Sequence, residues 1–425
     1  MKLTAQNDLH LTYCTNIHPG ESWEEVKINL QQYIPQLKAK LSSDRPFGIG
    51  LRLADTAAQE LLTGDNLVRF KAWLEQENLY VFTLNGFPYG GFHHQVVKDK
   101  VYAPDWSQST RLDYTLRLIQ ILKALLPDGM DGGISTLPLS YKPWWQSPQE
   151  RENTFEQSSI YLAQVVVQLA EVSKSTGKIL HLDLEPEPDG LLENTTEMIG
   201  FFQNWLFPVA GNWLQQQLGV DQETAQSLIT EHIRVCYDTC HFAIEYEEPQ
   251  EIIQRFQDAG IKIGKIQLSS AIKIAIPPEQ AERKLILDKL APFAESTYLH
   301  QVIAQNSDRS LDRYRDLTTA LPDLLTTEAG EWRTHFHVPI FIRNYQLFES
   351  TQEHIEQLLR LLPDNFVSHH LEIETYTWEV LPPDMKLDLA TSIEREYQWV
   401  LAQIEDRELT AATSLPQSIN LISST

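Results

Sequence analysis

One short segment, residues 179–187, constrains the fold of this 425-residue chain more than any other. Its polar residues His181, Asp183 and Glu185 alternate with three leucines before the chain reaches Pro186. Successive side chains of a strand point to opposite faces, so the alternation predicts a strand with one apolar and one polar face. Carboxylates at the end of an apolar strand lose hydration on burial and need a cation or hydrogen-bond donors to compensate them. A metal ion is a common compensating cation.

Three other segments repeat this arrangement at distant points of the chain. Their polar residues are Asp238 and His241 after the first apolar run, Lys265 and Gln267 within the second, and Glu372 and Glu374 in the third. In an α/β barrel the carboxyl ends of all strands converge on one site, so residues far apart in sequence can meet there. The repeated pattern therefore favours a barrel with one polar site at its mouth.

Strand-like segments alternate with helix-like segments along the whole chain. The first predicted helix opens with a capping-box pattern, Ser22 followed by Glu25. The eight predicted strands are Leu11–Ile17, Gly48–Leu53, Tyr80–Asn85, Gly132–Thr136, Ile179–Leu184, Ile233–Tyr237, Ile261–Leu268 and Leu371–Ile373. Eight strands with interleaved helices predict an α/β protein, a (β/α)8 TIM barrel with long insertions over its carboxyl-terminal face.

The domain prediction follows from the lengths of the connections. We predict a single barrel domain over residues 1–408, an insertion at about 269–365 between the seventh and eighth strands, and a polar tail over residues 409–425. Within the insertion, residues 298–305 and 334–342 are predicted as additional strands. Long ordered loops in compact domains are commonly functional, so we expect the insertion to cover the barrel mouth.

Composition excludes several classes of protein. The formal net charge of −24 opposes binding to nucleic acid, which normally depends on clustered Lys and Arg. No apolar run approaches the roughly twenty residues that span a bilayer, and the first residues do not resemble a signal peptide. Cys14, Cys236 and Cys240 have no CxxC spacing, so neither a disulfide framework nor a thiolate zinc site is indicated. We expect a cytoplasmic protein without an integral membrane segment.

The strand-end residues resemble those of a known superfamily. A Glu ending one strand, an Asp-x-x-His ending the next and a Glu ending the last are similar to the xylose isomerase-like TIM barrels, which include sugar isomerases, ketose 3-epimerases and endonucleases of the endonuclease IV type. A narrower resemblance, to the EboE family of metabolite traffic proteins within that superfamily, extends over nearly the whole chain. It rests on the segments TYCTNIHPGESW, TLNGFPYGGFH, VKDKVYAPDW, STLPLSYK, CYDTCHFAIEYE and HFHVPIF.

The resemblance implies a divalent metal ion, Mn²⁺, Zn²⁺ or Mg²⁺, at the barrel mouth. The strand that usually supplies a metal-binding His carries Gln267 here, and an amide oxygen is a weaker zinc ligand than an imidazole. Either the site takes a harder ion, or His335 or His337 completes it from the insertion, or the site is degenerate. The predicted metal ligands are Glu185, Asp238, Gln267, Glu374 and His337.

The resemblance also implies catalytic roles for four residues. Glu185 and Glu374 would act as base and acid on either side of a carbon atom next to a carbonyl group. His241 would orient a substrate hydroxyl, and Lys265 would neutralise an enolate or a phosphate. The predicted substrate contacts are His18, Asn85, Lys142 and His335.

Structural alternatives stay open beside these roles. Glu185, Asp238 and Glu374 could form a buried ion-pair network without metal, and Asp183 and Glu372 could be interior residues paired with Lys265 or Arg52. Trp144 and Trp145 could be a sugar-stacking platform or the small core of their own loop. His18 could simply end a strand.

Three classes of function remain. The first is a metal-dependent isomerase or epimerase acting on a small polyol, sugar or sugar phosphate. The second is a noncatalytic metabolite-binding or escort protein, with other proteins of the same metabolite-handling pathway as partners. The third is a phosphodiesterase with a multinuclear zinc site, which the acidity of the chain and the lack of several extra His ligands disfavour.

Overall fold

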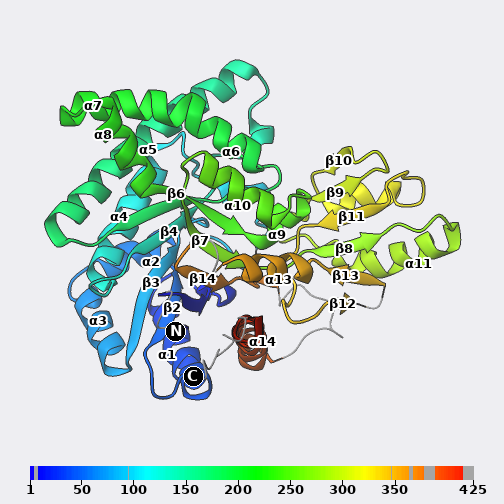
Figure 1. The fold of residues 1–425 in the computed structure, drawn as a ribbon, viewed down its shortest axis with the longest axis horizontal. Helices are drawn as coiled ribbons and strands as arrows, with labels where there is room; N and C mark the ends of the chain where they lie inside the picture. Colours follow the sequence, from blue (N-terminus) through cyan, green and yellow to red (C-terminus); the bar gives the residue numbers. More distant parts are fainter. Residues whose placement is uncertain (4–7, 94, 346, 363–366, 378–387, 415–425) are drawn as a thin grey trace, which may run out of the picture.

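The computed structural model describes all of the chain except residues 4–7, 94, 346, 363–366, 378–387 and 415–425 (Figure 1). For residues 406–414 the description is confined to the helical backbone. Every statement below refers to the described residues.

Eight parallel strands form the central sheet (Figure 1). They are β1 (His10–Tyr13), β2 (Phe47–Arg52), β3 (Leu79–Asn85), β4 (Gly132–Thr136), β5 (Leu180–Leu184), β6 (Ile233–Asp238), β7 (Ile263–Leu268) and β14 (His370–Ile373). Their order is β1-β14-β7-β6-β5-β4-β3-β2, and a bridge between Cys14 and Gly50 brings the two edge strands together. The sheet is a nearly closed barrel, and the predicted fold class is confirmed.

Helices surround this sheet and connect its strands. They are α1 (Trp23–Leu41), α2 (Asp55–Leu61), α3 (Asn66–Gln76), α4 (Ser109–Leu125), α5 (Pro148–Thr176), α6 (Thr195–Phe201), α7 (Gly211–Leu218), α8 (Gln222–His232), α9 (Thr239–Ile244), α10 (Pro249–Asp258), α13 (Gln352–Leu361) and α14 (Leu389–Ser414). The capping box that opens α1 is present, because Ser22 accepts from the backbone of Glu25 and the Glu25 carboxylate accepts in return from the backbone of Ser22. In α1 the side chains of Val26, Leu30, Ile34 and Leu37 are buried, as a helical period requires.

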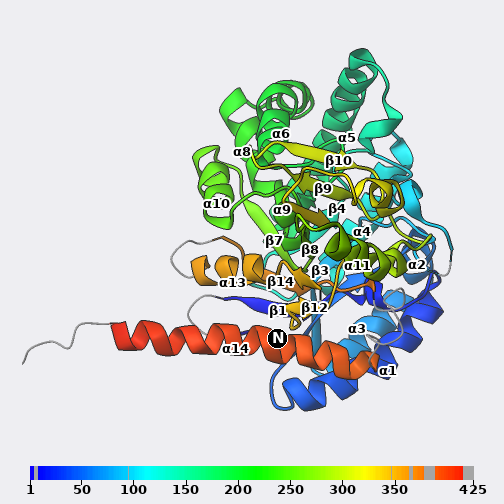
Figure 2. The same ribbon diagram turned by 90° about the vertical axis from the view of Figure 1, so that its right-hand side faces the viewer.

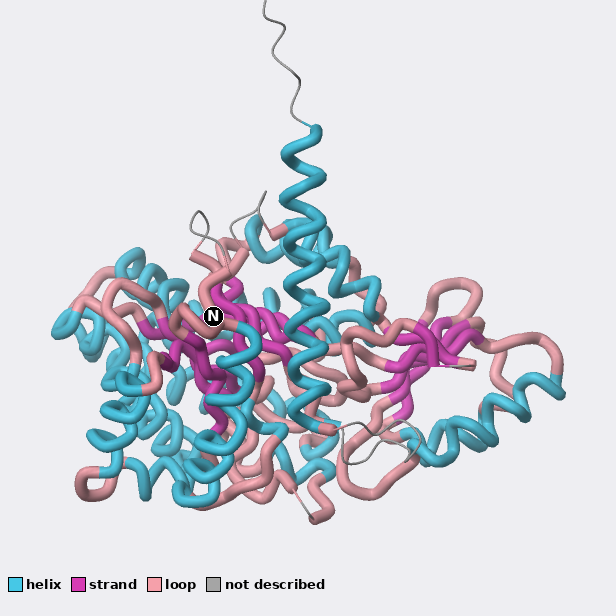
Figure 3. Tube along the Cα trace, turned by 90° about the horizontal axis from the view of Figure 1, so that it is seen from below, coloured by secondary structure: helices cyan, strands magenta, loops and turns pink. Residues whose placement is uncertain are grey.

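A second sheet occupies the segment between β7 and β14, and Figure 3 shows it beside the barrel strands. Its six antiparallel strands are β8 (Ile272–Ala275), β9 (Val302–Gln305), β10 (Leu311–Tyr314), β11 (Glu331–Thr334), β12 (Asn344–Tyr345) and β13 (Phe348–Ser350), in the order β10-β9-β11-β8-β13-β12. The helices α11 (Gln280–Leu290) and α12 (Leu317–Ala320) accompany it. This sheet lies within the region predicted as an insertion.

One predicted strand of the insertion is wrong. Residues 334–342 leave the sheet after Thr334, and the preceding residues form β11 instead. Pro339 has no amide hydrogen for a ladder, and the amide of Val338 donates to the carbonyl of Ser270, outside the sheet. The extended segment after β11 is therefore a loop that reaches the barrel.

The interior of the barrel contains ionisable side chains in pairs. Lys265 of β7 and Glu372 of β14 form an ion pair in which both side chains are fully buried. The Glu372 side chain fits only because residue 50 is a glycine: a Cβ atom at Gly50 would lie 1.9 Å from Oε1 of Glu372. Asp183 pairs with His181, at 2.6 Å between Oδ1 and Nδ1. The expected interior pairing of Glu372 with Lys265 is thus present.

The last described helix, α14, lies across one side of the barrel (Figure 2) and packs against α1 and α13. It continues through residue 414, so the first residues of the predicted polar tail are helical, and residues 415–425 lie outside the described part of the chain. Among the helices that the structure describes, none has the length and hydropathy needed to cross a membrane.

Candidate metal and substrate site

Three buried carboxylates meet where the barrel strands end. Glu185 follows β5, Asp238 ends β6 and Glu374 follows β14. One carboxylate oxygen from each lies within 4.8 Å of the other two. The topology explains this meeting, since parallel strands place their carboxyl ends at the same mouth. The sequence-predicted carboxylates are therefore together in space.

Hydrogen bonds fix one oxygen of two of these carboxylates. Oδ1 of Asp238 caps α9 by accepting from the amides of Cys240 and His241, at 2.8 and 3.2 Å, and it also accepts from the Ser269 hydroxyl. Oε1 of Glu374 accepts from the side-chain amides of Asn16 and Asn85, both at 2.8 Å. Each carboxylate is thus oriented by donors from several elements.

The remaining oxygens include two without a partner. Oε2 of Glu185 and Oδ2 of Asp238 are buried and have no hydrogen bond to any residue that the structure describes. Burial raises the pKa of Glu185 well above its usual value, and the nearby charges of Glu374 and Asp238 raise it further. Burial and the Asp238 charge raise the pKa of Glu374 in the same way. A buried oxygen without a partner is costly, so this group has the form of a cation site.

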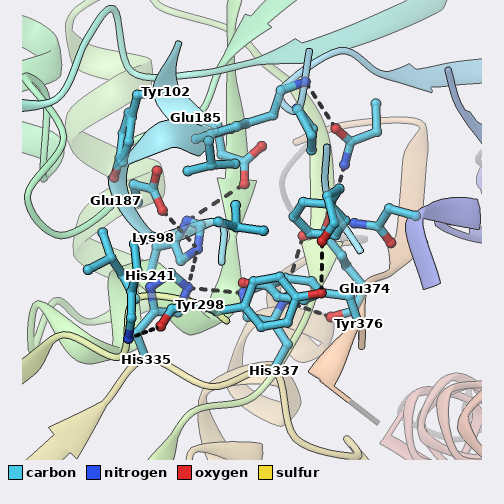
Figure 4. Close-up of a pocket in the computed structure, with 18 of the residues that line it drawn as sticks. Lys98, Tyr102, Glu185, Glu187, His241, Tyr298, His335, His337, Glu374 and Tyr376 are labelled. Atoms are coloured by element: carbon cyan, nitrogen blue, oxygen red, sulfur yellow. Dashed lines mark hydrogen bonds and ion pairs between the residues drawn. The ribbon is translucent and has the colours of Figure 1, made fainter. Parts of the chain in front are cut away.

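Three imidazoles lie directly beside the carboxylates (Figure 4). His241 belongs to α9, whereas His335 and His337 belong to the loop after β11. Nε2 of His335 is 3.1 Å from Nε2 of His241 and 3.3 Å from Nε2 of His337. Burial lowers the pKa of all three rings, which are therefore neutral near pH 7.

A small cavity of about 60 Å³ opens onto these groups. Six of the predicted site residues line it: Asn85, Glu185, His241, His335, His337 and Glu374. Aromatic side chains of Phe92, Tyr298 and Tyr376 contribute the apolar part of its wall, and Figure 4 shows the two tyrosines beside the imidazoles. The cavity thus combines a few convergent polar groups with apolar walls, as ligand sites do.

Five predicted site residues do not line the cavity: Asp238, which lies beside the two cavity-lining glutamates, and four residues that are held elsewhere. Lys265 is held by Glu372, and Oε1 of Gln267 accepts from the thiol of Cys236 at 2.8 Å. Lys142 pairs with Glu193 and Glu197, at 2.6 and 2.9 Å. His18 bonds to the Tyr13 hydroxyl at 2.8 Å and stacks on Tyr33. Each of these four side chains has partners of its own away from the cavity.

The two tryptophans of the predicted platform also bond within their surroundings. Nε1 of Trp144 donates to Asp99 at 2.9 Å, and Nε1 of Trp145 donates to the Ser140 hydroxyl at 2.8 Å. Both rings pack against the main core. The arrangement favours the alternative in which they form a local core.

Sequence reasoning missed several residues of the site. Glu187 lines the cavity, and its Oε2 lies 3.9 Å from Nε2 of His241. Its position two residues after Glu185 was a usable signal. Asn16, Gln301 and Tyr376 also line the cavity, but amides and tyrosines in predicted loops carry no comparable signal.

Comparison with known proteins shows that the fold of this chain is similar to folds in solved structures. No protein-family model and no curated protein sequence matches the chain. Solved structures that it resembles include a xylose isomerase-like TIM barrel protein from Mycobacterium smegmatis in complex with magnesium, with a TM-score of 0.49 and 11% identity over 94% of this chain and 97% of that one. Another is the IolI protein with a bound zinc atom, with a TM-score of 0.45 and 10% identity over 94% and 99% of the two chains.

A third similar structure is the probable 3-DHS dehydratase AsbF of Bacillus anthracis, with a TM-score of 0.42 and 12% identity over 92% of this chain and 98% of that one. Two further similar structures are described as xylose isomerase domain proteins. At these identities the likeness concerns the barrel alone. The narrower resemblance to EboE proteins is not confirmed by these matches.

Proposed function

We propose that the protein is a divalent-metal-dependent isomerase or epimerase that acts on a small sugar, sugar phosphate or other polyol. The observation that carries this proposal is the group of Glu185, Asp238 and Glu374, buried at the barrel mouth with two partnerless oxygens. The residues fit a divalent cation, because carboxylate oxygens are ligands for Mg²⁺, Mn²⁺ and Zn²⁺ and the unpartnered ones lack any other compensation.

Glu185, Asp238 and Glu374 would hold the ion, with His337 as a further predicted ligand. When bound, a divalent ion stabilises the negative charge that develops on neighbouring substrate oxygens. The proposed ligand set excludes Gln267, because its side-chain oxygen accepts from the Cys236 thiol.

Two features of the site support a role of Glu185 and Glu374 in proton transfer. Both glutamates line the cavity, and they come from strands on different parts of the barrel wall, β5 and β14. Burial raises the pKa of each carboxyl group in the metal-free protein, and the charge of a bound ion would lower it again. Asn16 and Asn85 hold Oε1 of Glu374, so the orientation of this carboxylate is set before substrate enters. His241 would orient a substrate hydroxyl.

The cavity limits the size of the substrate. A volume of about 60 Å³ suits a small metabolite rather than a polymer. A bound sugar would contact the aromatic wall of Phe92, Tyr298 and Tyr376.

The sequence resemblance to EboE proteins supports a second candidate. In this second function the protein binds the metabolite without converting it. It would act as an escort in the cytoplasm, together with other proteins of the same pathway. Such a role needs the cavity but does not need proton transfer by Glu185 and Glu374.

Exchange of hydrogen for deuterium separates the two candidates. The metal-loaded protein is incubated in D₂O with a panel of ketoses, aldoses and their phosphates, and mass spectrometry follows deuterium on substrate carbon. We expect exchange with at least one sugar, and a loss of about 100-fold or more in Glu185→Gln and Glu374→Gln. Glu152→Gln, at an exposed position of α5, is the matched control. Sugar binding without exchange, unchanged in Glu374→Gln, would instead support the escort role.

A further inference from the structure

The hydrogen bonds of the three imidazoles determine which nitrogen of each ring carries its hydrogen. Nδ1 of His241 lies 3.1 Å from the carbonyl oxygen of Pro186, and Nδ1 of His335 lies 2.8 Å from Oε1 of Gln301. Nδ1 of His337 lies 2.8 Å from the carbonyl oxygen of Glu374. A carbonyl oxygen only accepts, so each Nδ1 must be the donor. In a neutral ring Nε2 is then a bare acceptor.

These bare nitrogens face one another. The Nε2 atoms of His241 and His335 are 3.1 Å apart, and those of His335 and His337 are 3.3 Å apart. Two acceptors at hydrogen-bond distance with no hydrogen between them repel, and Nε2 of His335 lies at this distance from both of the other rings. A cation between them would turn this repulsion into coordination. Donation of the second ring nitrogen to a carbonyl oxygen is also the usual way in which proteins orient metal-binding histidines.

The imidazoles differ from the carboxylates in the part of the chain that supplies them and in the metal ions that they favour. Two of them come from the insertion, whereas Glu185 and Glu374 come from the barrel strands. Asp238 connects the two sets, because its carboxylate lies within 4.8 Å of ligand atoms of both His241 and His337, and of both glutamates. Imidazole ligands suit Zn²⁺ and similar transition metals, while all-carboxylate sites suit Mg²⁺ and Mn²⁺.

We propose that His241, His335 and His337 form a second cation site, selective for Zn²⁺ or a similar transition metal, beside the carboxylate site and sharing Asp238 and His337 with it. This inference goes beyond the proposed function, which requires only the carboxylate site. It also assigns a role to the insertion: the loop after β11 supplies two of the three nitrogen ligands.

Spectroscopy on the unaltered full chain tests the ligand set directly. The protein is freed of metal with a chelator and loaded with one equivalent of Cu²⁺, whose electron spin echo is modulated by the remote nitrogens of bound imidazoles. We expect modulation from more than one imidazole. A bound Cu²⁺ without imidazole modulation would overturn the proposal, and this result does not depend on the folding of any variant.

Titration of variants then separates the two sites. His335→Ala should weaken Zn²⁺ binding by at least about 100-fold, because removal of even an orienting partner of a ligand costs 10- to 100-fold. It should leave Mn²⁺ binding at the carboxylates in place. The matched control is His354→Gln, a buried histidine outside the site whose Nε2 bonds to the Tyr237 hydroxyl at 2.8 Å. Unchanged Zn²⁺ affinity in His335→Ala would contradict the imidazole site.

The proposed function can fail without this inference. If the protein binds Zn²⁺ through the imidazoles but binds no Mn²⁺ or Mg²⁺ and exchanges no deuterium, the isomerase proposal is wrong and the imidazole site stands. If Mn²⁺ binds and exchange occurs, but His335→Ala leaves the Zn²⁺ affinity unchanged, the isomerase proposal stands and the imidazole site is wrong.

Discussion

Glu396 of α14 is a buried carboxylic acid that forms no ion pair with any residue the structure describes. It accepts a hydrogen bond from the Thr375 hydroxyl at 2.7 Å and one from the amide of Ile340 at 3.3 Å, so it joins α14 to the end of β14 and to the insertion loop. Burial raises the pKa of Glu396 from its ordinary value of 4.5 to about 8. Folding therefore favours the protonated form of this group.

The sign of its effect on stability follows from this pKa. Below pH 4.5 the carboxyl group is protonated in both the folded and the unfolded chain, and ionisation costs nothing. Between pH 4.5 and about 8 the unfolded chain releases the proton and the folded chain keeps it, so stability is lost as the pH rises. Above about pH 8 the loss is constant. With about 1.4 kcal/mol per pKa unit, the loss is about 1 kcal/mol at pH 5 and about 4 kcal/mol at pH 8.

Glu396→Gln should remove this loss while keeping an acceptor for Thr375 and Ile340. We expect the variant to be more stable than the unaltered protein by about 1 kcal/mol at pH 5 and by about 4 kcal/mol at pH 8. Urea unfolding at both pH values in the presence of a chelator measures the difference. Glu405→Gln, at an exposed position of the same helix, is the control and should show no pH-dependent gain. An equal effect of Glu396→Gln at pH 5 and pH 8 would refute the reasoning.

Four other outcomes are expected. Gly50→Ala should destabilise the protein by about 1–3 kcal/mol in urea unfolding, because its Cβ would overlap Glu372, whereas Gly211→Ala at an open helical position should not. Lys265→Met should cost about 3–5 kcal/mol in the same assay, since it leaves a buried carboxylate unpaired. Removal of metal with a chelator should lower the melting temperature, and a thousandfold excess of metal over its Kd should restore about 4 kcal/mol. Duplex DNA should not bind at physiological salt in a mobility-shift assay, because the net charge is −24.

The barrel and its carboxylates were predictable because each depends on a local pattern. Strand β5 runs from Leu180 to Leu184, and the predicted strand differs from it by a single residue at its start. The positions of Glu185 and Glu374 follow from the strand ends and from the geometry of parallel sheets, which requires no knowledge of other side chains. The alternation of side chains along each strand, and the rule that parallel strands end at the same mouth, were sufficient to predict this part of the site.

The imidazole group was only partly predictable. The sequence predicted a strand over residues 334–342, which contains His335 and His337, but the observed strand β11 ends at Thr334. Their distance from His241 depends on the path of an insertion whose six strands pair only with one another. Nothing in the residues around Lys142 indicated that Glu193 and Glu197 would hold it away from the cavity. Such contacts are tertiary, and no local period encodes them.

The pairing of β1 with β14 has a consequence for synthesis on the ribosome. Strand β1 completes its parallel ladder only with residues 370–373, so the barrel cannot close until these residues have been translated. Before that point the edge of β1 that pairs with β14 has no partner strand, and Glu374 is not yet present at the barrel mouth. Contacts between such distant segments slow folding, and long-lived partly folded chains expose apolar surface to aggregation. We therefore expect the expression yield to depend on the supply of chaperones even if the folded barrel is stable.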